Sequence, residues 1–455
     1  MITTKGGIFM HLPNYIKEIL QILNDHGKEA FVVGGSIRDF LLNLPVHDYD
    51  ITTNALPQES ITFFKNHHYE IDLDGIKHGS IRLLKNGKEV ELTTYREEFD
   101  YFDHRHPSRI QFNQDLLTDL KRRDFTMNAI AYHPNIGFID PYQGIDDINN
   151  QIIRSINDPN IRFEEDALRI LRALRFAYTL HFELETSLKE AIINKSYLID
   201  YISKNRIRDE FCKMLMGNEE NLLQKLRNFN ILDKIIPGYE KTYFFPQHNV
   251  WHIYDVFTHC DVALNHTKGY PLNLKLTMVF HDIGKPQAHF FDQQNFPRFH
   301  KHPYYSAILC REIMENLQFD NKTINEVVRF VEDHDYRLKE TKSDVRKLLA
   351  RYDFDYKKVM QLFDIQIADN YAKNLKLALP EIQKCMRIKK MIIDLQQEES
   401  PLTLKELCIN GNDLLALGYK GKEIKTLLQQ LHDYVLDDPK NNQKAILLQY
   451  LETLN

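Results

Sequence analysis

Cysteine is scarce in this sequence, and long apolar runs are absent from it. Five cysteines are scattered over 455 residues, and no two of them have the C-x-x-C spacing of a zinc ribbon. We therefore expect reduced thiols that serve packing: Cys212, Cys260, Cys310, Cys385 and Cys408. Neither residues 1–23 nor any later run is as apolar as a signal peptide or the roughly 18-residue core of a membrane helix. The sequence therefore predicts a cytoplasmic protein that does not associate with membranes.

An excess of positive charge is also missing. The 58 lysines and arginines are outnumbered by 64 aspartates and glutamates, which gives a net charge of −6. This balance excludes a uniformly basic nucleic-acid binder, so any RNA contact must come from local basic surface and must be sensitive to salt. With 43% hydrophobic and 27% charged residues, the composition is that of an ordinary soluble protein. The length predicts roughly three or four domains.

A short apolar run followed by two glycines forms the most informative stretch. Ala30 to Val33 reads A-F-V-V, which predicts a buried strand, and Gly34 and Gly35 then allow a tight turn. A helix is expected to begin at Ser36, whose side chain suits an N-cap. The free amides at such a helix start would face the space above the glycines, where a phosphate chain usually binds.

Two aspartates follow this helix at alternating positions. The run Asp48-Tyr49-Asp50-Ile51 predicts a strand that projects both carboxylates from one face. Carboxylates placed in this way can hold a divalent cation between them, which is the geometry of metal-assisted phosphate chemistry. Read alone, an Asp-x-Asp pair more often lies in a solvated loop.

The spacing of the whole stretch is far more specific than any one part. It fits the signature G-G-x-[VI]-R-D-x-L-L-x-x-x-x-x-D-x-D-x-x-T at Gly34, Gly35, Arg38, Asp39, Leu41, Leu42, Asp48, Asp50 and Thr53. The stretch closely resembles the catalytic motif of the class II nucleotidyltransferases. These are the bacterial and eukaryotic tRNA CCA-adding enzymes and the bacterial poly(A) polymerases, with a head like that of the polymerase beta superfamily. Asn43 stands where that family usually has glycine.

The resemblance implies roles for residues of this stretch. Asp48 and Asp50 would be catalytic and would hold Mg²⁺. Gly34, Gly35 and Arg38 would bind the triphosphate of the incoming nucleotide.

The residues after Thr53 predict the rest of a small mixed sheet. We expect a helix from Pro57 to Asn66 and strands near residues 70–73, 79–84 and 89–94, with a hairpin turn at Asn86-Gly87. Glu91 on the last strand is a candidate third carboxylate of the metal site. An exposed strand glutamate is the commoner case.

The segment from Tyr95 to Phe112 is polar, aromatic and basic, and Pro107 interrupts it. We predict a mobile loop that returns to a strand. The segment resembles the flexible loop of the CCA-adding family, including Arg105 and Pro107. Specialised CC-adding members of that family have a shortened loop, whereas complete CCA-adding and A-adding members keep it. The resemblance therefore favours one of the latter two.

A second motif lies at residues 121–129, which read K-R-R-D-F-T-M-N-A. Arginine offers forked donors to phosphate oxygens, and a carboxylate can accept from ribose hydroxyls. A charged turn before a strand is the alternative. The run R-R-D-F-T-x-N-A resembles a motif of the same family and implies that Arg123 and Asp124 contact the nucleotide. Residues 140–147 resemble the D-P-x-x-G-x-x-D motif that joins head to neck.

After the head the composition becomes helical, and we expect a long helix that opens at Glu165. Asp166 and Arg169 would share a face, and Arg169, Arg172 and Arg175 would form a basic ridge. A carboxylate acceptor beside a guanidinium donor suits the Watson–Crick edges of both cytosine and adenine. An ordinary i,i+3 salt bridge is the alternative. The E-D-x-x-R pattern resembles the family's amino-acid template for CTP and ATP, which implies nucleotide binding by Asp166, Arg169 and Arg172.

Two regions are candidates for contact with tRNA. Residues 201–216 resemble the closing helix of the family's neck, with Arg206 and Arg208 as candidate contacts. A solvated helix face is at least as common an explanation for these arginines. The C-terminal segment resembles the family's tail, which implies contact with the tRNA body through Lys420 and Lys422.

Histidines and aspartates indicate a second site. His281 and Asp282 are adjacent on an apolar helix, with His259 and Asp369 about a helix pair away on each side. Imidazole and carboxylate together suit a transition metal or magnesium. The set resembles the H...HD...D elements of the HD phosphohydrolase domain, which implies hydrolysis of phosphate esters such as 2′,3′-cyclic phosphates or damaged RNA ends.

Two further histidines, His302 and His334, are candidates for additional metal ligands or phosphate contacts of this HD domain. A decayed HD scaffold that binds no metal is the alternative.

The sequence thus predicts an α+β protein with a small mixed-sheet nucleotidyltransferase head followed by an all-α neck, HD body and tail. The expected boundaries are 1–145, 146–217, 218–375 and 376–455. The resemblance implies template-independent addition of CCA to tRNA 3′ ends from CTP and ATP, with no obligate protein partner. Alternatives are an A-adding tRNA nucleotidyltransferase, a poly(A) polymerase, an HD phosphohydrolase with a vestigial head, and a non-enzymatic tRNA-binding module.

Overall fold

The chain, a computed structural model, is described for residues 9–101, 103–105, 107–112, 115–294, 297–398 and 403–454. It divides into two compact units. The first comprises Met1–Glu219 and Lys225–Ile235, and the second comprises Glu220–Gln224 and Ile236–Asn455. This division falls close to the predicted end of the neck at residue 217. The finer split into head, neck, HD body and tail stays a prediction.

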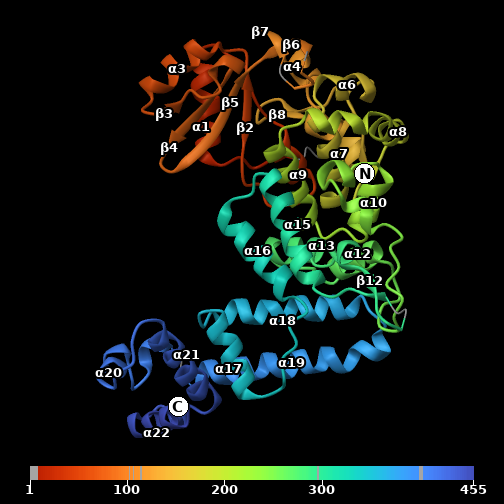
Figure 1. The fold of residues 1–455 in the computed structure, drawn as a ribbon. Coiled ribbons are helices and arrows are strands. Elements are labelled where there is room, and N and C mark those ends of the chain that lie inside the picture. Colours follow the sequence, from red (N-terminus) through yellow and green to blue (C-terminus); the bar gives the residue numbers. More distant parts are fainter. Residues whose placement is uncertain are drawn as a thin grey trace. The chain divides into compact units, whose positions relative to one another are not determined.

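A seven-stranded mixed sheet forms the head (Figure 1). β2 runs parallel to β5 and antiparallel to β1. In sheet order the strands are β3 (Glu70–Asp72), β4 (Ser80–Lys85), β5 (Lys88–Thr94), β2 (Asp50–Thr53), β1 (Ala30–Val33), β8 (Ala131–His133) and β9 (Gly137–Ile139). β1 is buried along its whole length because it lies between β2 and β8, which explains its unbroken apolar sequence.

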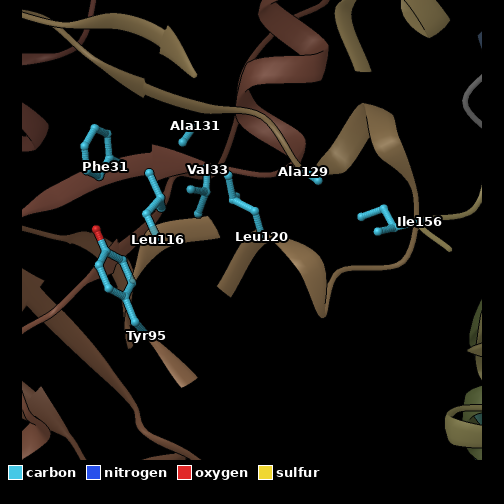
Figure 2. Packing of buried hydrophobic residues seen from close by; sticks show 8 residues of the cluster. All are labelled: Phe31, Val33, Tyr95, Leu116, Leu120, Ala129, Ala131 and Ile156. Atoms are coloured by element: carbon cyan, nitrogen blue, oxygen red, sulfur yellow. The ribbon is translucent and has the colours of Figure 1, made fainter. Parts of the chain in front are cut away.

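Helices flank this sheet in the chain, and their apolar residues complete its core. They are α1 (Asn14–Asp25), α2 (Gly35–Leu41), α3 (Pro57–Asn66), α4 (Leu116–Lys121) and α5 (Gly144–Asn149). Figure 2 shows one buried cluster, which consists of Phe31, Val33, Tyr95, Leu116, Leu120, Ala129, Ala131 and Ile156. This cluster fixes β1 against α4 and β8, so the glycine turn at the end of β1 starts from a rigid position.

The head contains two hairpins, one that the sequence predicted and one that it predicted only in part. Asn86 and Gly87 join β4 to β5 with left-handed φ of 52° and 71°, as the predicted hairpin turn requires. The segment over residues 95–112 returns to a strand as predicted, β7 (Pro107–Phe112), but its first part is not a loop, because β6 (Arg96–Tyr101) pairs with β7 as an antiparallel hairpin. Pro107 can open β7 because the first residue of a strand tolerates a missing amide donor.

The remainder of the first unit is mainly helical. Its elements are β10 (Ile152–Ile153), α6 (Pro159–Glu165), α7 (Leu168–Leu180), β11 (Glu183–Leu184), α8 (Thr186–Lys195), α9 (Lys204–Met216) and α11 (Leu232–Ile235). α7 packs against α9, and β10 pairs in parallel with β11. The single long helix predicted from Glu165 is wrong, because α6 ends at Glu165 and α7 begins at Leu168.

The second unit contains helices and one short two-stranded ribbon. After α10 (Leu222–Asn228), which crosses the division, they are α12 (Val256–Asn265), α13 (Leu272–Phe280), α14 (Lys285–Ala288), β12 (Phe290–Phe291), β13 (Pro297–Arg298), α15 (His302–Asn316), α16 (Asn321–Asp333), α17 (Lys342–Arg351), α18 (Tyr356–Tyr371), α19 (Leu375–Gln397), α20 (Gly411–Ala416), α21 (Lys422–Asp437) and α22 (Lys444–Leu454). The α+β class and the order of mixed sheet before helices are as predicted.

Side-chain caps set the starts of several of these helices. Asp255 accepts from the Thr258 amide at the start of α12, and Asp320 accepts from the Thr323 amide at the start of α16. α18 and α19 lie side by side (Figure 1). Across the described ranges, each helix is too short or too polar to cross a lipid bilayer.

Candidate active site and histidine centre

A glycine turn opens the head site. Gly34 has a φ of 80° and caps α2, so the prediction that Ser36 is the N-cap is wrong. The Ser36 hydroxyl donates to the Val33 carbonyl oxygen at 3.3 Å instead. A Cβ on Gly34 would lie 3.1 Å from Arg123 Nη1 and 3.6 Å from Asp50 Oδ2. Glycine therefore keeps open the space between a guanidinium and a carboxylate.

Carboxylates gather on the other side of that space. Asp50 is the first residue of β2, and Asp48 precedes the strand, so the predicted strand over residues 48–51 begins two residues late. The predicted alternation survives, because Tyr49 is buried whereas Asp48 and Asp50 both reach the solvent. Glu91 lies opposite Asp50 in the register of β2 with β5.

The electrostatics of these carboxylates fit a cation. Partial burial raises the pKa of Asp50, and Glu91 and Asp48 raise it further, while Arg123 opposes them. Among the described residues, no basic side chain forms an ion pair within 4 Å of Asp48, Asp50 or Glu91. Carboxylates that repel one another and form no close ion pair provide the oxygen ligands that Mg²⁺ prefers.

A pocket of about 440 Å³ extends from the glycine turn. Its lining includes Gly34, Gly35, Arg38, Asp50, Arg123, Asp124, Asn128, Asp166, Arg169, Arg172 and Arg206. The structure thus brings together every nucleotide-binding residue that the sequence predicted. Asn128, which the sequence analysis did not single out, accepts from Arg38 Nη1 at 2.9 Å and orients that guanidinium.

Asp124 is almost fully engaged by the protein. Its Oδ1 accepts from the Phe125 amide at 2.8 Å and from Asn128 Nδ2 at 2.9 Å, and its Oδ2 accepts from Arg172 at 2.8 and 2.6 Å. Burial raises the pKa of Asp124, but Arg172 and these hydrogen bonds hold it well below its usual range. Asp124 therefore joins the head to α7. Its predicted contact with ribose stays a prediction.

Asp166 lies in the break between α6 and α7. Its Oδ1 accepts at 3.1 Å from the amide of Leu168, which is the first residue of α7. Arg169 is nearly buried, and it donates to the carbonyl oxygens of Arg162 and Arg122 at 3.2 and 2.9 Å and to Glu165 at 3.0 Å. Within the described residues, Asp166 and Arg169 form no salt bridge with each other, so the alternative of an i,i+3 pair is excluded.

The basic ridge predicted on this helix is wrong. Arg172 is paired with Asp124, and Arg175 is paired with Glu210 at 2.5 Å. These guanidiniums therefore tie α7 to neighbouring elements and do not form a solvated stripe.

The hairpin closes a second cavity of about 370 Å³ beside Asp166. Tyr101, Arg105 and Pro107 line it together with Asp166, Arg169 and Arg206. The hairpin is held to the helix break through His104, whose Nδ1 lies 2.7 Å from the Glu164 carbonyl oxygen. The Ala167 amide in turn donates to the His104 carbonyl oxygen at 3.0 Å.

The predicted tRNA contacts occupy different environments. Arg206 lines both cavities, whereas Arg208 pairs with Asp209 at 2.8 Å. Lys420 and Lys422 are exposed at the start of α21. Contact of these four residues with tRNA stays a prediction.

Four histidines of the second unit form a centre in which all the rings are oriented in the same way. Each of four imidazoles directs Nδ1 at a main-chain carbonyl oxygen: His259 at Ala372 (3.1 Å), His281 at Met278 (2.9 Å), His302 at Phe299 (3.1 Å) and His334 at Val331 (2.7 Å). A carbonyl oxygen can only accept, so this contact assigns a proton to Nδ1 and directs Nε2 at the other side chains of the centre. This arrangement is typical of metal-binding histidines.

The predicted ligands converge in this centre. The Nε2 atoms of His259 and His281 lie 3.2 Å apart, and His259 Nε2 lies 3.3 Å from Asp282 Oδ2 and 2.9 Å from Asp369 Oδ1. His259, His281 and Asp282 are one group whose donor atoms all lie within 4.8 Å, and Asp282, His302 and His334 are a second.

Two lysines, which the sequence analysis missed, accompany these carboxylates: Lys285 is buried, and Lys373 is partly exposed. Lys285 Nζ lies 2.5 Å from Asp282 Oδ2, and Lys373 Nζ lies 2.7 Å from Asp369 Oδ2. Burial raises the pKa of both carboxyls, but the lysines hold them well below their usual range. The spacing was a usable signal, because each lysine follows its aspartate by three or four residues, which is one helical turn.

The centre opens into a cavity of about 650 Å³. Its lining includes Trp251, Asp282, Lys285, Arg298, His302, His334, Arg337, Asp369 and Lys373. Cations next to a histidine and aspartate cluster suit a phosphate group.

Three family models match parts of the chain. The Poly A polymerase head domain matches residues 30–154. The probable RNA and SrmB-binding site of polymerase A matches residues 181–242, and the tRNA nucleotidyltransferase domain 2 matches residues 306–451.

Curated relatives and solved structures agree with these models. The CCA-adding enzyme of Staphylococcus haemolyticus is 31% identical over 447 residues, which cover 96% of this chain and 97% of that protein. The CCA-adding enzyme of Lactobacillus helveticus is 47% identical over 199 residues, and there the chain spans about half (49%) of the relative's length. In fold, the chain is similar to the Bacillus stearothermophilus CCA-adding enzyme in complex with CTP, with a TM-score of 0.69 and 24% identity over 97% of this chain and 99% of that one.

Proposed function

The chain belongs to the CCA-adding enzymes, a family of class II tRNA nucleotidyltransferases, and we propose that it adds CCA to the 3′ end of tRNA from CTP and ATP. Pyrophosphate would be the second product. The observation that carries this proposal is the placement of Asp50 and Arg123 on either side of the Gly34 turn. A cation-binding carboxylate and a phosphate-binding guanidinium separated by open backbone are the parts that nucleotidyl transfer needs.

Each group of the head has a role in this reaction. Asp48 and Asp50, supported by Glu91, would hold divalent cations, for which we propose Mg²⁺. When bound, such ions lower the pKa of the primer 3′-hydroxyl and neutralise charge on the leaving pyrophosphate. Arg38 and Arg123 would donate to the triphosphate oxygens. The Gly34 turn lets the phosphates approach the main chain.

The base would be selected at the break between α6 and α7. One Asp166 oxygen accepts from the Leu168 amide, and the other is available to accept from the exocyclic amine of cytosine or adenine. Arg169 has five N–H donors, of which the three hydrogen bonds described above use three, so it can still donate to a ring nitrogen. Uracil and guanine present a carbonyl to Asp166, which would leave two acceptors facing each other.

The tRNA would be held by basic residues outside this pocket, for which we propose Arg206, Arg208, Lys420 and Lys422. Arg206 has the strongest support because it lines both cavities of the head and neck. We propose that these contacts act in the cytoplasm and need no obligate protein partner.

The test is a tRNA transcript without its CCA end, incubated with CTP and ATP singly and together and sized on a gel. CCA addition extends the transcript by two residues with CTP and by three with both nucleotides. Extension only of a transcript that already ends in CC would establish the A-adding alternative. An unlimited A tail would establish a poly(A) polymerase.

A second activity, phosphate-ester hydrolysis, is favoured by the histidine centre. His259, His281, Asp282 and Asp369 would hold a divalent ion, either a transition metal or Mg²⁺, which would activate water for attack on phosphorus. Lys285, Lys373 and Arg298 line the same cavity and would bind the phosphate oxygens. Hydrolysis of 2′,3′-cyclic nucleotides to nucleoside monophosphates by wild type, and not by His281→Ala, tests this activity. Equal rates for both proteins would refute it.

A further inference from the structure

A third cavity of the first unit has a volume of about 190 Å³ and is lined by residues of four strands of the sheet, β1, β2, β4 and β5. It shares Asp50 and Arg123 with the nucleotide pocket, but it contains Glu91 in place of the glycine turn. Its volume is below the roughly 300–1,000 Å³ of most ligand sites. The third cavity therefore suits one part of a ligand whose remainder lies elsewhere.

Two guanidiniums line this third cavity: Arg96 of β6, and Arg122 directly after α4. Arg96 donates from Nε to Glu98 at 2.7 Å and from Nη1 to the His78 carbonyl oxygen. Arg122 donates from Nε to Asp119 at 2.8 Å. Among the described residues, neither Nη2 group donates a hydrogen bond. Both guanidiniums thus keep donors for a ligand.

The charges around these guanidiniums are suited to one anion. Arg96, Arg122 and Arg123 carry three positive charges, and the acids paired with them are Glu98 and Asp119. Burial lowers the pKa of Arg96, and the neighbouring charge of Arg122 lowers it further. A single negative charge bound between Arg96 and Arg122 would relieve this repulsion, and a phosphodiester carries one such charge.

Arg96 and Arg122 also line the second cavity, which the hairpin closes. Arg105 and Arg206 belong to the wall of that cavity. The Arg122 carbonyl oxygen accepts from Arg169 at 2.9 Å, which fixes the main chain of Arg122 to the helix break where we propose base selection. A basic path thus leads from the third cavity over the two guanidiniums into the hairpin cavity.

The direction of the reaction requires a hydroxyl in the third cavity. In phosphoryl and nucleotidyl transfer, the attacking oxygen and the leaving group lie in line on opposite sides of the phosphorus. With the triphosphate at the Gly34 turn, the hydroxyl must approach Asp50 from the other side, where Glu91 and the third cavity lie. The 3′-oxygen then bonds to the α-phosphorus, the bond to the β-phosphate breaks, and the hydroxyl proton passes to water.

We propose that the third cavity holds the terminal ribose of the tRNA primer, and that Arg96 and Arg122 bind the last phosphodiester of that strand. The Ser80 and Thr93 hydroxyls, which lie 2.9 Å apart in the same cavity, provide hydrogen bonds to the ribose. The preceding nucleotide enters through the hairpin cavity. This inference rests on the proposed CCA addition and adds to it the residues that place the attacking hydroxyl.

The test measures ATP addition to tRNA that ends in CC, with its last phosphodiester either natural or replaced by a neutral methylphosphonate. In the wild type, the methylphosphonate should lower kcat/KM roughly 10- to 100-fold, which is the usual worth of a hydrogen bond to a charged group. KM for ATP should stay unchanged, because the triphosphate binds at the Gly34 turn. A methylphosphonate in the acceptor stem is the control and should have little effect.

Variants identify the partners of this phosphodiester. Arg96→Gln and Arg122→Gln should each lower kcat/KM for natural tRNA by a similar factor, after which the methylphosphonate should cause almost no further loss. Arg96→Lys keeps a positive charge and should recover part of the rate. Arg109→Gln is the matched control, because Arg109 is an exposed arginine of the same hairpin that lines none of the three cavities, and it should behave like the wild type.

Two outcomes would overturn the primer site, and thermal unfolding checks that each variant is folded. One is the absence of any loss when the wild type receives the methylphosphonate, a result that needs no variant. The other is an equal loss in the wild type and in Arg96→Gln. Failure of the wild type to extend even natural tRNA is a distinct result, which would refute CCA addition and the primer site with it.

Discussion

Asp50 and Glu91 lie directly opposite each other in the parallel register of β2 and β5. Paired residues of neighbouring strands project from the same face, so the two carboxylates are forced together. After the larger effect of burial, Glu91 is the next cause of the raised pKa of Asp50. The fold therefore maintains a repulsion that a bound cation would relieve.

Asp50→Ala should abolish nucleotide addition while sparing tRNA binding. Loss of an oxygen ligand for the catalytic cations should lower kcat at least about a thousandfold. Single-turnover incorporation of labelled CTP and filter binding of tRNA measure the two properties. Asp74→Ala, an exposed carboxylate of the same head, is the matched control and should keep wild-type rates. Full activity of Asp50→Ala would refute the proposed role of Asp50 as a ligand of the catalytic cations.

The acid limb of the pH–rate profile should respond to the neighbours of Asp50. The carboxylate must be ionised to bind a cation, and its raised pKa moves the loss of activity to a higher pH than an ordinary aspartate would give. Glu91→Gln removes a repulsive charge and should move this limb to lower pH. Arg123→Gln removes an attractive charge and should move it to higher pH. Shifts of kcat/KM in the opposite directions would contradict this assignment.

The raised pKa of Asp50 also predicts that removal of its charge makes the folded protein more stable at neutral pH. A carboxyl whose pKa is higher in the folded than in the unfolded protein contributes stability below its unfolded pKa, and this contribution is lost as the pH rises through the folded value. At pH 7 without divalent cations, Asp50 therefore destabilises the fold. Asp50→Asn should raise Tm at pH 7 and have little effect near pH 3, as followed by circular dichroism. A lower Tm at pH 7 would show that the carboxylate is stabilising.

Asp166→Ala should relax the choice among nucleotides. When the Asp166 carboxylate is removed, the carbonyls of uracil and guanine no longer face an acceptor oxygen. Discrimination against UTP and GTP should therefore fall by roughly a hundredfold or more. The measurement is kcat/KM for each nucleotide on tRNA ending before the CCA. Asp166→Asn keeps the oxygen that accepts from the Leu168 amide, so it separates base choice from helix stability. Unchanged discrimination in both variants would refute the base-selecting role.

Arg172→Ala should destabilise the first unit. It leaves the buried Asp124 carboxylate without its cation, which typically costs about 3–5 kcal/mol. Lys189→Ala breaks an exposed pair with Glu183 and should cost no more than about 1 kcal/mol. Urea unfolding of both variants provides the comparison, and an equal cost for the two would contradict a structural role for Arg172.

The central elements of the head could be predicted from local sequence. The apolar run of β1, the helix over Pro57–Asn66 and the Asn86-Gly87 turn were predicted because strand burial, helix capping and hairpin turns depend on neighbouring residues. The residues predicted to bind the nucleotide were identified through motif spacing, and the structure places them in one pocket.

Several errors arose where distant contacts decide. Residues 165–169 contain no helix breaker, and the helix is interrupted because the Ala167 amide bonds to His104, more than sixty residues earlier in the chain. The error at Ser36 is a local one, because Gly34 caps α2 and the Ser36 hydroxyl donates to the carbonyl oxygen of Val33, three residues earlier. The convergence of two histidine pairs on Asp282 depends on elements that are distant in the chain, which no local pattern specifies.

The bond from Ala167 to His104 also has a mechanical consequence. Movement of the hairpin away from α7 would remove the His104 carbonyl oxygen, which accepts from the Ala167 amide. Ala167 is the residue that follows Asp166. The hairpin is thus coupled to the residues around Asp166, where we propose that the base is selected, and neither can move without the other. Substitutions at the tip of the hairpin should therefore change which nucleotide is accepted, even though the tip itself need never touch the base.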